Sequence, residues 1–71
     1  MRDLDEELEQ AHRQIASLTA RIAERREQIE QMPQGGLANE NARALLYVME
    51  AVLMHRHNYR QRLQGLRSLA A

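Results

Sequence analysis

The sequence of 71 residues contains no cysteine, tryptophan, phenylalanine or lysine, and it has one proline and three glycines. Without cysteine, neither a disulfide framework nor a cysteine-based zinc site can stabilise the chain. A domain of this length buries only about 60% of the surface of its unfolded chain, so an independent core is marginal. We therefore expect self-association or a partner protein to complete the fold.

The net charge is zero, and aromatic residues make up only 3% of the chain. Dedicated nucleic-acid-binding proteins usually carry an excess of basic residues together with aromatic rings for stacking, so the composition argues against this class.

A charged fraction of 28% and short apolar runs argue against a membrane span, which needs about 20 apolar residues. Acidic residues follow Met1 where a secretory signal would be basic and then apolar. These features predict a cytoplasmic protein.

Helix-breaking residues are concentrated at residues 32–36, Met-Pro-Gln-Gly-Gly, and they divide the chain into two halves of similar length. Proline disfavours helical geometry at the preceding residue, and glycine permits the positive φ of a tight reversal. The sequence predicts a helix over 3–31, a turn over 32–36 and a helix over 37–69. The predicted fold is an all-α antiparallel two-helix hairpin, coiled-coil-like, that forms a single domain over residues 1–71.

Apolar residues recur at alternating spacings of four and three in both halves, which is the heptad pattern of a helix packed against another helix. In the first half this seam is interrupted by Arg25, and in the second by Arg56. The predicted seam of the first helix is Leu4, Leu8, Ala11, Ile15, Leu18, Ile22, Ile29 and Met32. The predicted seam of the second helix is Ala38, Ala42, Leu45, Met49, Val52, Tyr59, Leu63, Leu66 and Ala70.

The two halves carry opposite net charges. Residues 1–32 have eight acidic residues and five arginines, a net charge of −3, and residues 33–71 have two acidic residues and five arginines, a net charge of +3. An antiparallel hairpin places the acidic start of the first helix beside the basic end of the second. Exposed ion pairs contribute only about 0 to 1 kcal/mol each, so we expect these charges to set orientation more than stability.

Residues 44–54 are apolar at every position except Glu50. One neighbouring helix covers only one stripe of this segment, and monomeric proteins avoid a large apolar surface on the opposite side. We expect either a second copy of the chain or a different helical protein to cover it. The residues expected to bind a partner are Leu46, Tyr47, Val48, Leu53, Met54 and Arg56.

The residues capable of catalysis or metal binding form no recognisable motif. His55 and His57 are two residues apart, whereas a helical metal site needs its ligands four apart on one face. The serines and the threonine have no base and acid at motif spacing, and a hairpin offers no cleft for a substrate. We expect no catalytic residues, no bound metal and no cofactor. One remaining possibility is a polyanion site at the basic end, formed by Arg56, Arg60, Arg62 and Arg67 together with His55 and His57.

The amphipathic first helix, the Pro/Gly turn and residues 44–63, ALLYVMEAVLMHRHNYRQRL, resemble the small co-chaperones of bacterial type III secretion needle subunits. The resemblance covers nearly the whole chain. It implies a non-enzymatic adaptor that binds a tetratricopeptide-like chaperone and helps to keep the needle subunit soluble before export. It also implies that Leu46, Val48, Leu53 and Met54 meet the chaperone.

Residues 47–51 and 54–55 are also similar to small helical antiactivators of quorum-sensing regulators. The alternative to the co-chaperone is therefore a homodimeric four-helix protein with a structural or regulatory role, either antiactivator-like or RNA-binding.

Overall fold

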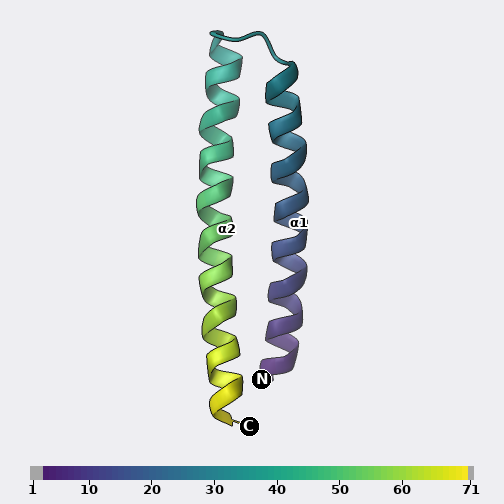
Figure 1. The fold of residues 1–71 in the computed structure, drawn as a ribbon, viewed down its shortest axis with the longest axis vertical. Helices are drawn as coiled ribbons and strands as arrows, with labels where there is room; N and C mark the ends of the chain where they lie inside the picture. The colour runs from purple at the N-terminus through teal and green to yellow at the C-terminus, as the bar shows by residue number, and fades with distance from the viewer. Residues whose placement is uncertain (1–2, 71) are drawn as a thin grey trace.

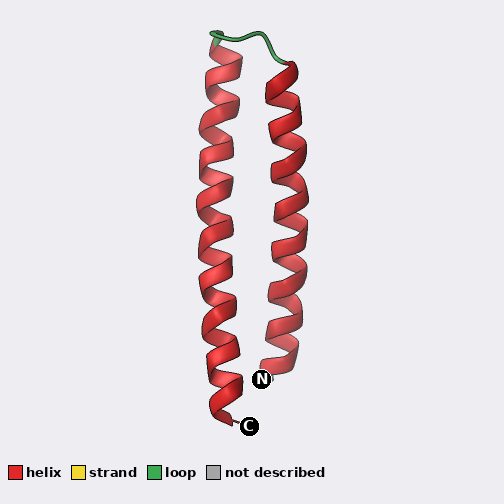
Figure 2. Cartoon of the chain, viewed as in Figure 1, coloured by secondary structure: helices red, strands yellow, loops and turns green. Residues whose placement is uncertain are grey.

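The computed structural model describes residues 3–70, which form two helices joined by a short loop (Figures 1 and 2). Helix α1 spans Leu4–Gln31 and helix α2 spans Leu37–Ala70. The helices lie side by side in opposite directions, with both chain ends at the same end of a rod of 52 × 18 × 14 Å (Figure 1). The predicted all-α antiparallel hairpin is confirmed. Helix α1 begins one residue later than expected, and helix α2 ends one residue later.

Helix α1 begins at a side-chain cap. The Asp3 carboxylate Oδ1 accepts a hydrogen bond from the backbone N–H of Glu6 at 2.8 Å, which satisfies one of the free donors of the first turn. The first turn also contains Asp5, Glu6 and Glu7, whose negative charges are favourable near the positive end of the helix dipole.

The loop contains the conformations that its residues favour. Met32 ends helix α1 in an extended conformation, as expected for a residue that precedes proline. Gly35 has φ +81°, in the left-handed region that only glycine adopts without strain. Helix α2 then starts with a hydrogen bond from the Glu40 N–H to the Gly36 carbonyl at 3.1 Å.

The core lies along one face of helix α1. Five of the six buried apolar residues belong to this helix, and they follow the predicted seam: Leu8, Ala11, Ile15, Ile22 and Ile29. Helix α2 contributes only Leu63, which packs with Leu8 and Ala11 near the chain ends. The inward face of helix α1 therefore agrees with the sequence pattern.

Helix α2 is rotated relative to the predicted seam. Four of the predicted seam positions turn toward α1 as expected, namely Ala42, Met49, Arg56 and Leu63. Each of the other inward positions lies one residue later in the chain than predicted. Asn39, Leu46, Leu53 and Arg60 occupy the places predicted for Ala38, Leu45, Val52 and Tyr59. At the rim of the seam, the Tyr59 hydroxyl donates a hydrogen bond to the Glu7 carboxylate at 3.2 Å. Tyr59 is 39% exposed, and this rim position lets its hydroxyl find a hydrogen-bond partner at the surface.

Helix α2 continues through Gly65 to Ala70 and extends past the start of helix α1 (Figure 1). Over the described residues, neither helix contains a stretch sufficiently long and apolar to cross a membrane.

Candidate protein-binding surface

The six residues expected to bind a partner are divided between two sides of helix α2. Tyr47, Val48 and Met54 are exposed, whereas Leu46 and Leu53 are half-buried in the seam with helix α1. The prediction placed both leucines beside the seam, but the rotation of α2 turns them into it. Helix α1 therefore already covers them, and a partner can reach only the outward residues of the set.

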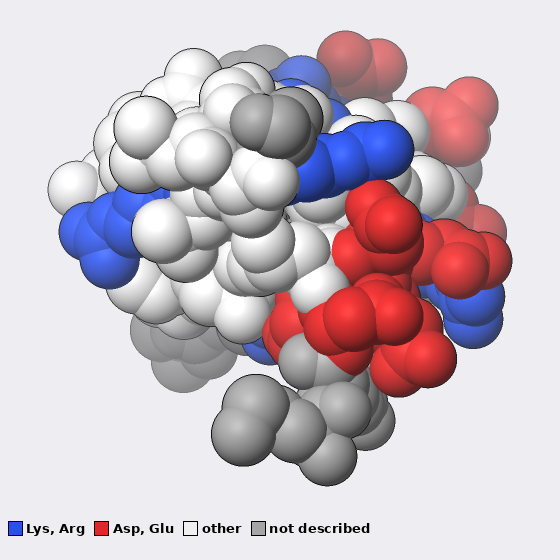
Figure 3. Space-filling view, turned by 90° about the horizontal axis from the view of Figure 1, so that it is seen from below, with Lys and Arg blue, Asp and Glu red and all other residues white. Residues whose placement is uncertain are grey.

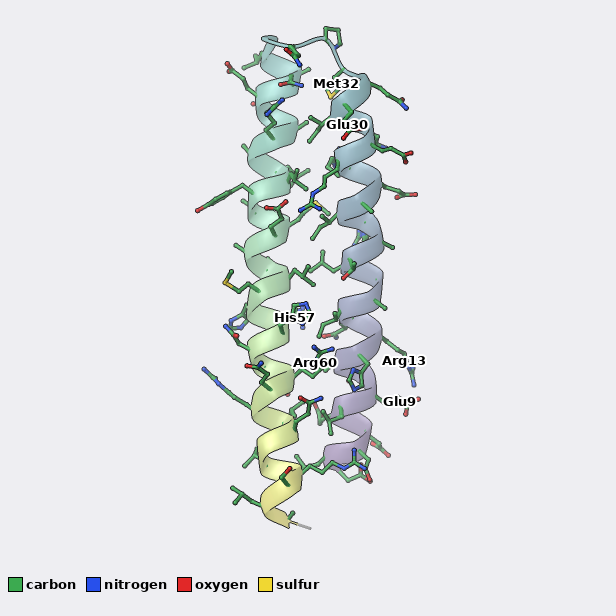
Figure 4. The ribbon with its side chains drawn as sticks, viewed as in Figure 1. Glu9, Arg13, Glu30, Met32, His57 and Arg60 are labelled. Carbon is green, nitrogen blue, oxygen red and sulfur yellow. The ribbon has the colours of Figure 1, made fainter. Side chains whose placement is uncertain are left out.

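Arg56 also turns toward helix α1. Its Nη1 atom donates a hydrogen bond to Gln14 Oε1 at 2.6 Å, and the arginine is half-buried. Arg60 lies one turn further along the seam, with Nη2 3.1 Å from His57 Nδ1; both side chains point from α2 into the space beside α1 (Figure 4). The Arg60 Nε atom is buried without a hydrogen-bond partner among the described residues. The lower half of the seam is therefore partly polar.

The upper end of the seam is polar as well. Asn39 is the one buried polar residue among those described, with 5% of its surface exposed. Its Oδ1 accepts a hydrogen bond from Arg43 Nε at 2.9 Å, but its Nδ2 has no partner. An unpaired buried polar atom costs about 1 to 3 kcal/mol. The burial of Asn39 could not be predicted from the sequence, because an asparagine near a helix start usually remains in solvent.

We define the outer patch as Tyr47, Ala51 and Met54, three residues at helical spacing on the side of α2 away from α1. Tyr47 is 75% exposed and Met54 is 67% exposed. Val48 is also exposed at the edge of the patch. Burial of a large apolar side chain contributes about 1.5 to 3 kcal/mol, so another helix would gain several kcal/mol by covering this surface.

A second apolar feature of α2, which we call the second stripe, follows a heptad pattern of its own. Its first members are Leu45 and Val48, each one residue before the seam residues Leu46 and Met49. The complete stripe is Leu45, Val48, Val52, His55, Tyr59, Arg62, Leu66 and Leu69, and all of these residues are exposed. The sequence pattern had assigned four of them to the seam, so this stripe was not expected as a surface.

Helix α1 presents a polar face beside the second stripe. Three shallow hollows, each of about 320 to 380 Å³, run along the groove between them. In the first hollow, Glu7, Gln10 and Gln14 face His55 and Tyr59. In the next hollow along, Ser17 and Arg21 face Val52. One side of the hairpin therefore has a polar edge on α1 and an apolar edge on α2.

Charges of opposite sign meet at the end that holds both chain termini. Figure 3 shows the molecule from this end: acidic side chains gather on one side, with arginines beside them. Arg67 Nε lies 3.2 Å from Asp5 Oδ1, across the two helices. Of the four arginines of the possible polyanion site, Arg67 contacts this carboxylate, Arg56 contacts Gln14 and Arg60 contacts His57. Three of the four arginines are thus engaged within the hairpin.

Among residues 3–70, no three histidine or acidic side chains lie close enough together to hold a metal ion. His12 and His55 are exposed, and His57 is half-buried between the helices. The chain matches no family model, no curated protein and no solved structure, so the comparisons assign it to no family.

Proposed function

We propose that this chain is a non-enzymatic adaptor that binds a helical partner protein through the outer patch of helix α2. The observation that carries the proposal is the exposure of Tyr47 and Met54, two turns apart, on the side that α1 cannot reach. Both side chains suit such a role. Tyrosine combines apolar area with a hydroxyl that tolerates water, and methionine adapts its shape to irregular partner surfaces.

The resemblance to needle-subunit co-chaperones supports a particular partner class. On this proposal, the chain joins a tetratricopeptide-like chaperone in the cytoplasm, and the two proteins together keep the needle subunit soluble before export. Tetratricopeptide repeats stack pairs of helices into a concave surface, and an exposed helix face fits such a surface. Val48 and Met54, which the resemblance implies at this contact, are both exposed.

The hairpin's own seam also supports a further protein contact on helix α2. Helix α2 leaves Leu45, Val52 and Leu66 at the surface, while Asn39 and Arg60 occupy the seam with unpaired polar atoms. A free hairpin would be more stable if the apolar residues faced α1 and the polar side chains of Asn39 and Arg60 were in solvent. The observed packing is favourable when another protein surface covers the exposed side of α2.

The direct test is a calorimetric titration of this chain with the tetratricopeptide-like chaperone from the same genome. We expect a saturable complex with one chain per chaperone. The double variant Tyr47→Glu/Met54→Glu should weaken binding at least 100-fold, because each glutamate would be buried against an apolar surface. Leu37→Glu is the matched control, since Leu37 is 73% exposed on the same helix but lies outside the outer patch. Equal binding by the double variant and the control would exclude the outer patch as the contact.

A further inference from the structure

The second stripe is placed so that helix α2 can have a second helical neighbour. Each stripe position comes one residue before a seam position, and one residue corresponds to about 100° around an α-helix. A helix in a four-helix bundle meets its two neighbours at nearly this angle. Helix α1 occupies one of these directions, and the second stripe faces the other.

We propose that the chain forms an antiparallel homodimer in which the second stripe of one copy packs against the second stripe of the other. In this arrangement Leu45 lies opposite Leu69 of the second copy, and Val48 lies opposite Leu66 of the second copy. The apolar residues at one end of the stripe therefore cover those at the other end of the second copy. The two polar stripe residues, His55 and Arg62, lie near the middle of the interface. Such self-complementarity is the requirement of a two-fold interface.

A parallel dimer of the same stripe is unfavourable. It would place each residue opposite its own copy, so Arg62 would face Arg62 and His55 would face His55. Two arginines held together in a helix interface repel each other and lose hydration. In the antiparallel dimer, Arg62 instead lies opposite Val52 of the second copy, where its aliphatic stem can pack and its guanidinium can reach water.

The position of the two-fold axis follows from the stripe. The midpoint between Leu45 and Leu69 is at the level of residue 57, and Arg56 at this level donates its hydrogen bond to Gln14 of α1. An axis perpendicular to the helices keeps both α1 helices on the same side of the α2 pair. The polar face of α1 that borders the groove then faces the same face of the second α1, with Gln14 at the axis.

Helix α1 is charged in the way this arrangement requires. Glu7 lies seven residues before Gln14 and Arg21 lies seven residues after it, on the same face of α1. The two-fold axis therefore brings Glu7 of each copy opposite Arg21 of the other. Two ion pairs of opposite charge therefore form on the polar side. The axis follows from the stripe on α2 alone, so the charges on α1 are independent support for the dimer.

The interface of the dimer combines three rows of side chains. The second stripe is flanked by small or short side chains that let the helix backbones approach closely, and the α1 face adds a further polar row. The flanking residues are Ala44, Asn58 and Gly65, and a Cβ atom at Gly65 would meet no more distant part of its own chain within 4 Å.

This inference goes beyond the proposed function and does not depend on it. Tyr47 and Met54 lie outside the dimer interface, so a dimer would present two outer patches to partner proteins. The two tests are distinguishable, because the titration changes Tyr47 and Met54, whereas the dimer tests change residues of the second stripe and of α1.

Sedimentation equilibrium over a dilution series tests the dimer. We expect the mass of two chains for the unmodified protein and at least 100-fold weaker association for Leu66→Glu, which places two carboxylates in the interface. Leu37→Glu is again the control, because Leu37 lies beyond the part of α2 that the second copy covers. A single-chain mass for the unmodified protein, or an unchanged dimer for Leu66→Glu, would overturn the proposal.

A charge reversal tests the two-fold axis and does not depend on apolar substitutions that could affect folding. Arg21→Glu should weaken association about tenfold, since two like-charge contacts replace two attractive ones. The double variant Glu7→Arg/Arg21→Glu should restore most of the lost association. Glu27→Arg is the matched control, because Glu27 is exposed on α1 and lines none of the three hollows of the groove. Absence of rescue would contradict this axis.

Because the chain has no cysteine, disulfide cross-linking can report orientation directly. A mixture of the Val48→Cys and Leu66→Cys variants should form the mixed disulfide under mild oxidation. Each variant alone should stay uncross-linked, because copies of one position lie about 27 Å apart along the antiparallel helices. Cross-linking of Val48→Cys with itself would instead indicate a parallel pair and would overturn the proposal.

Discussion

Helix α1 supplies five of the six buried apolar residues, although helix α2 is the more hydrophobic of the two. The difference lies in how many faces of each helix are apolar. Helix α1 has one apolar stripe, so its large side chains can only turn toward α2. Helix α2 has a seam, a second stripe and an outer patch, and α1 can cover only the first. In a small hairpin, hydrophobic content beyond one stripe therefore measures capacity for binding more than internal stability.

The largest effect should come from the single stripe of α1. Ile22 is 4% exposed, and Ile22→Ala should lower the free energy of unfolding by about 2 to 4 kcal/mol, because it removes buried methyl groups and leaves a cavity. Tyr47→Ala on the outer patch should change the unfolding free energy of the hairpin by less than about 0.5 kcal/mol. Urea unfolding followed by circular dichroism compares the two variants. Similar losses for both would show that the apolar surface of α2 already contributes to hairpin stability.

The sequence was sufficient to predict the fold class and the inward face of α1, for physical reasons. The breakers at residues 32–36 leave only one place for the reversal, and α1 has only one apolar stripe to bury. The inward face of α2 could not be derived in the same way. Two heptad seams share Ala42, Met49, Arg56 and Leu63, and both have regular spacing. Apolar counting favoured the seam with Leu45 and Val52, whereas the structure places their neighbours inward.

The same ambiguity limited the prediction of the binding surface. Tyr47 and Met54 lie far from both possible seams, so their exposure could be predicted from helical geometry alone. A small rotation of α2 decides whether Leu46 and Leu53 or the preceding residues, Leu45 and Val52, face α1. Heptad spacing alone is compatible with both. Interhelical hydrogen bonds such as those from Arg56 to Gln14 and from Tyr59 to Glu7 depend on this rotation. They become recognisable only when both helices are in place.

Replacing a polar residue of the α2 seam should have a smaller effect, and it should increase stability instead of lowering it. Arg60→Leu should raise the free energy of unfolding by about 1 to 2 kcal/mol, because it removes a buried Nε atom without a partner and adds apolar contact. Gln61→Leu on the exposed neighbouring position is the control and should change little. Thermal unfolding of the two variants at equal concentration provides the measurement. Destabilisation by Arg60→Leu would mean that the contact between Arg60 and His57 outweighs the burial of the charge.

The glycines of the loop and of α2 should respond oppositely to the same substitution. Gly35→Ala should destabilise the hairpin by about 1 kcal/mol, because φ +81° is strained for any residue with a side chain. Gly65→Ala should stabilise it by about 0.5 to 1 kcal/mol, since Gly65 lies within a helix and a methyl group there meets no neighbouring atom. Chemical unfolding midpoints compare the two. A loss of stability in Gly65→Ala would indicate that close backbone packing needs this glycine.

The smallest effect should come from the charges that connect the two helices. Arg26 Nη2 lies 2.8 Å from Glu50 Oε1, but the two side chains remain 61% and 41% exposed to solvent. A double-mutant cycle of Arg26→Ala and Glu50→Ala should therefore give a coupling of only about 0.2 to 0.5 kcal/mol, and added salt should reduce it further. A coupling above about 1.5 kcal/mol would contradict the view that the apolar stripe of α1 provides most of the stability of the hairpin. The polar rim would then contribute to stability on the scale of the apolar stripe of α1, and charge would do more than select the antiparallel orientation.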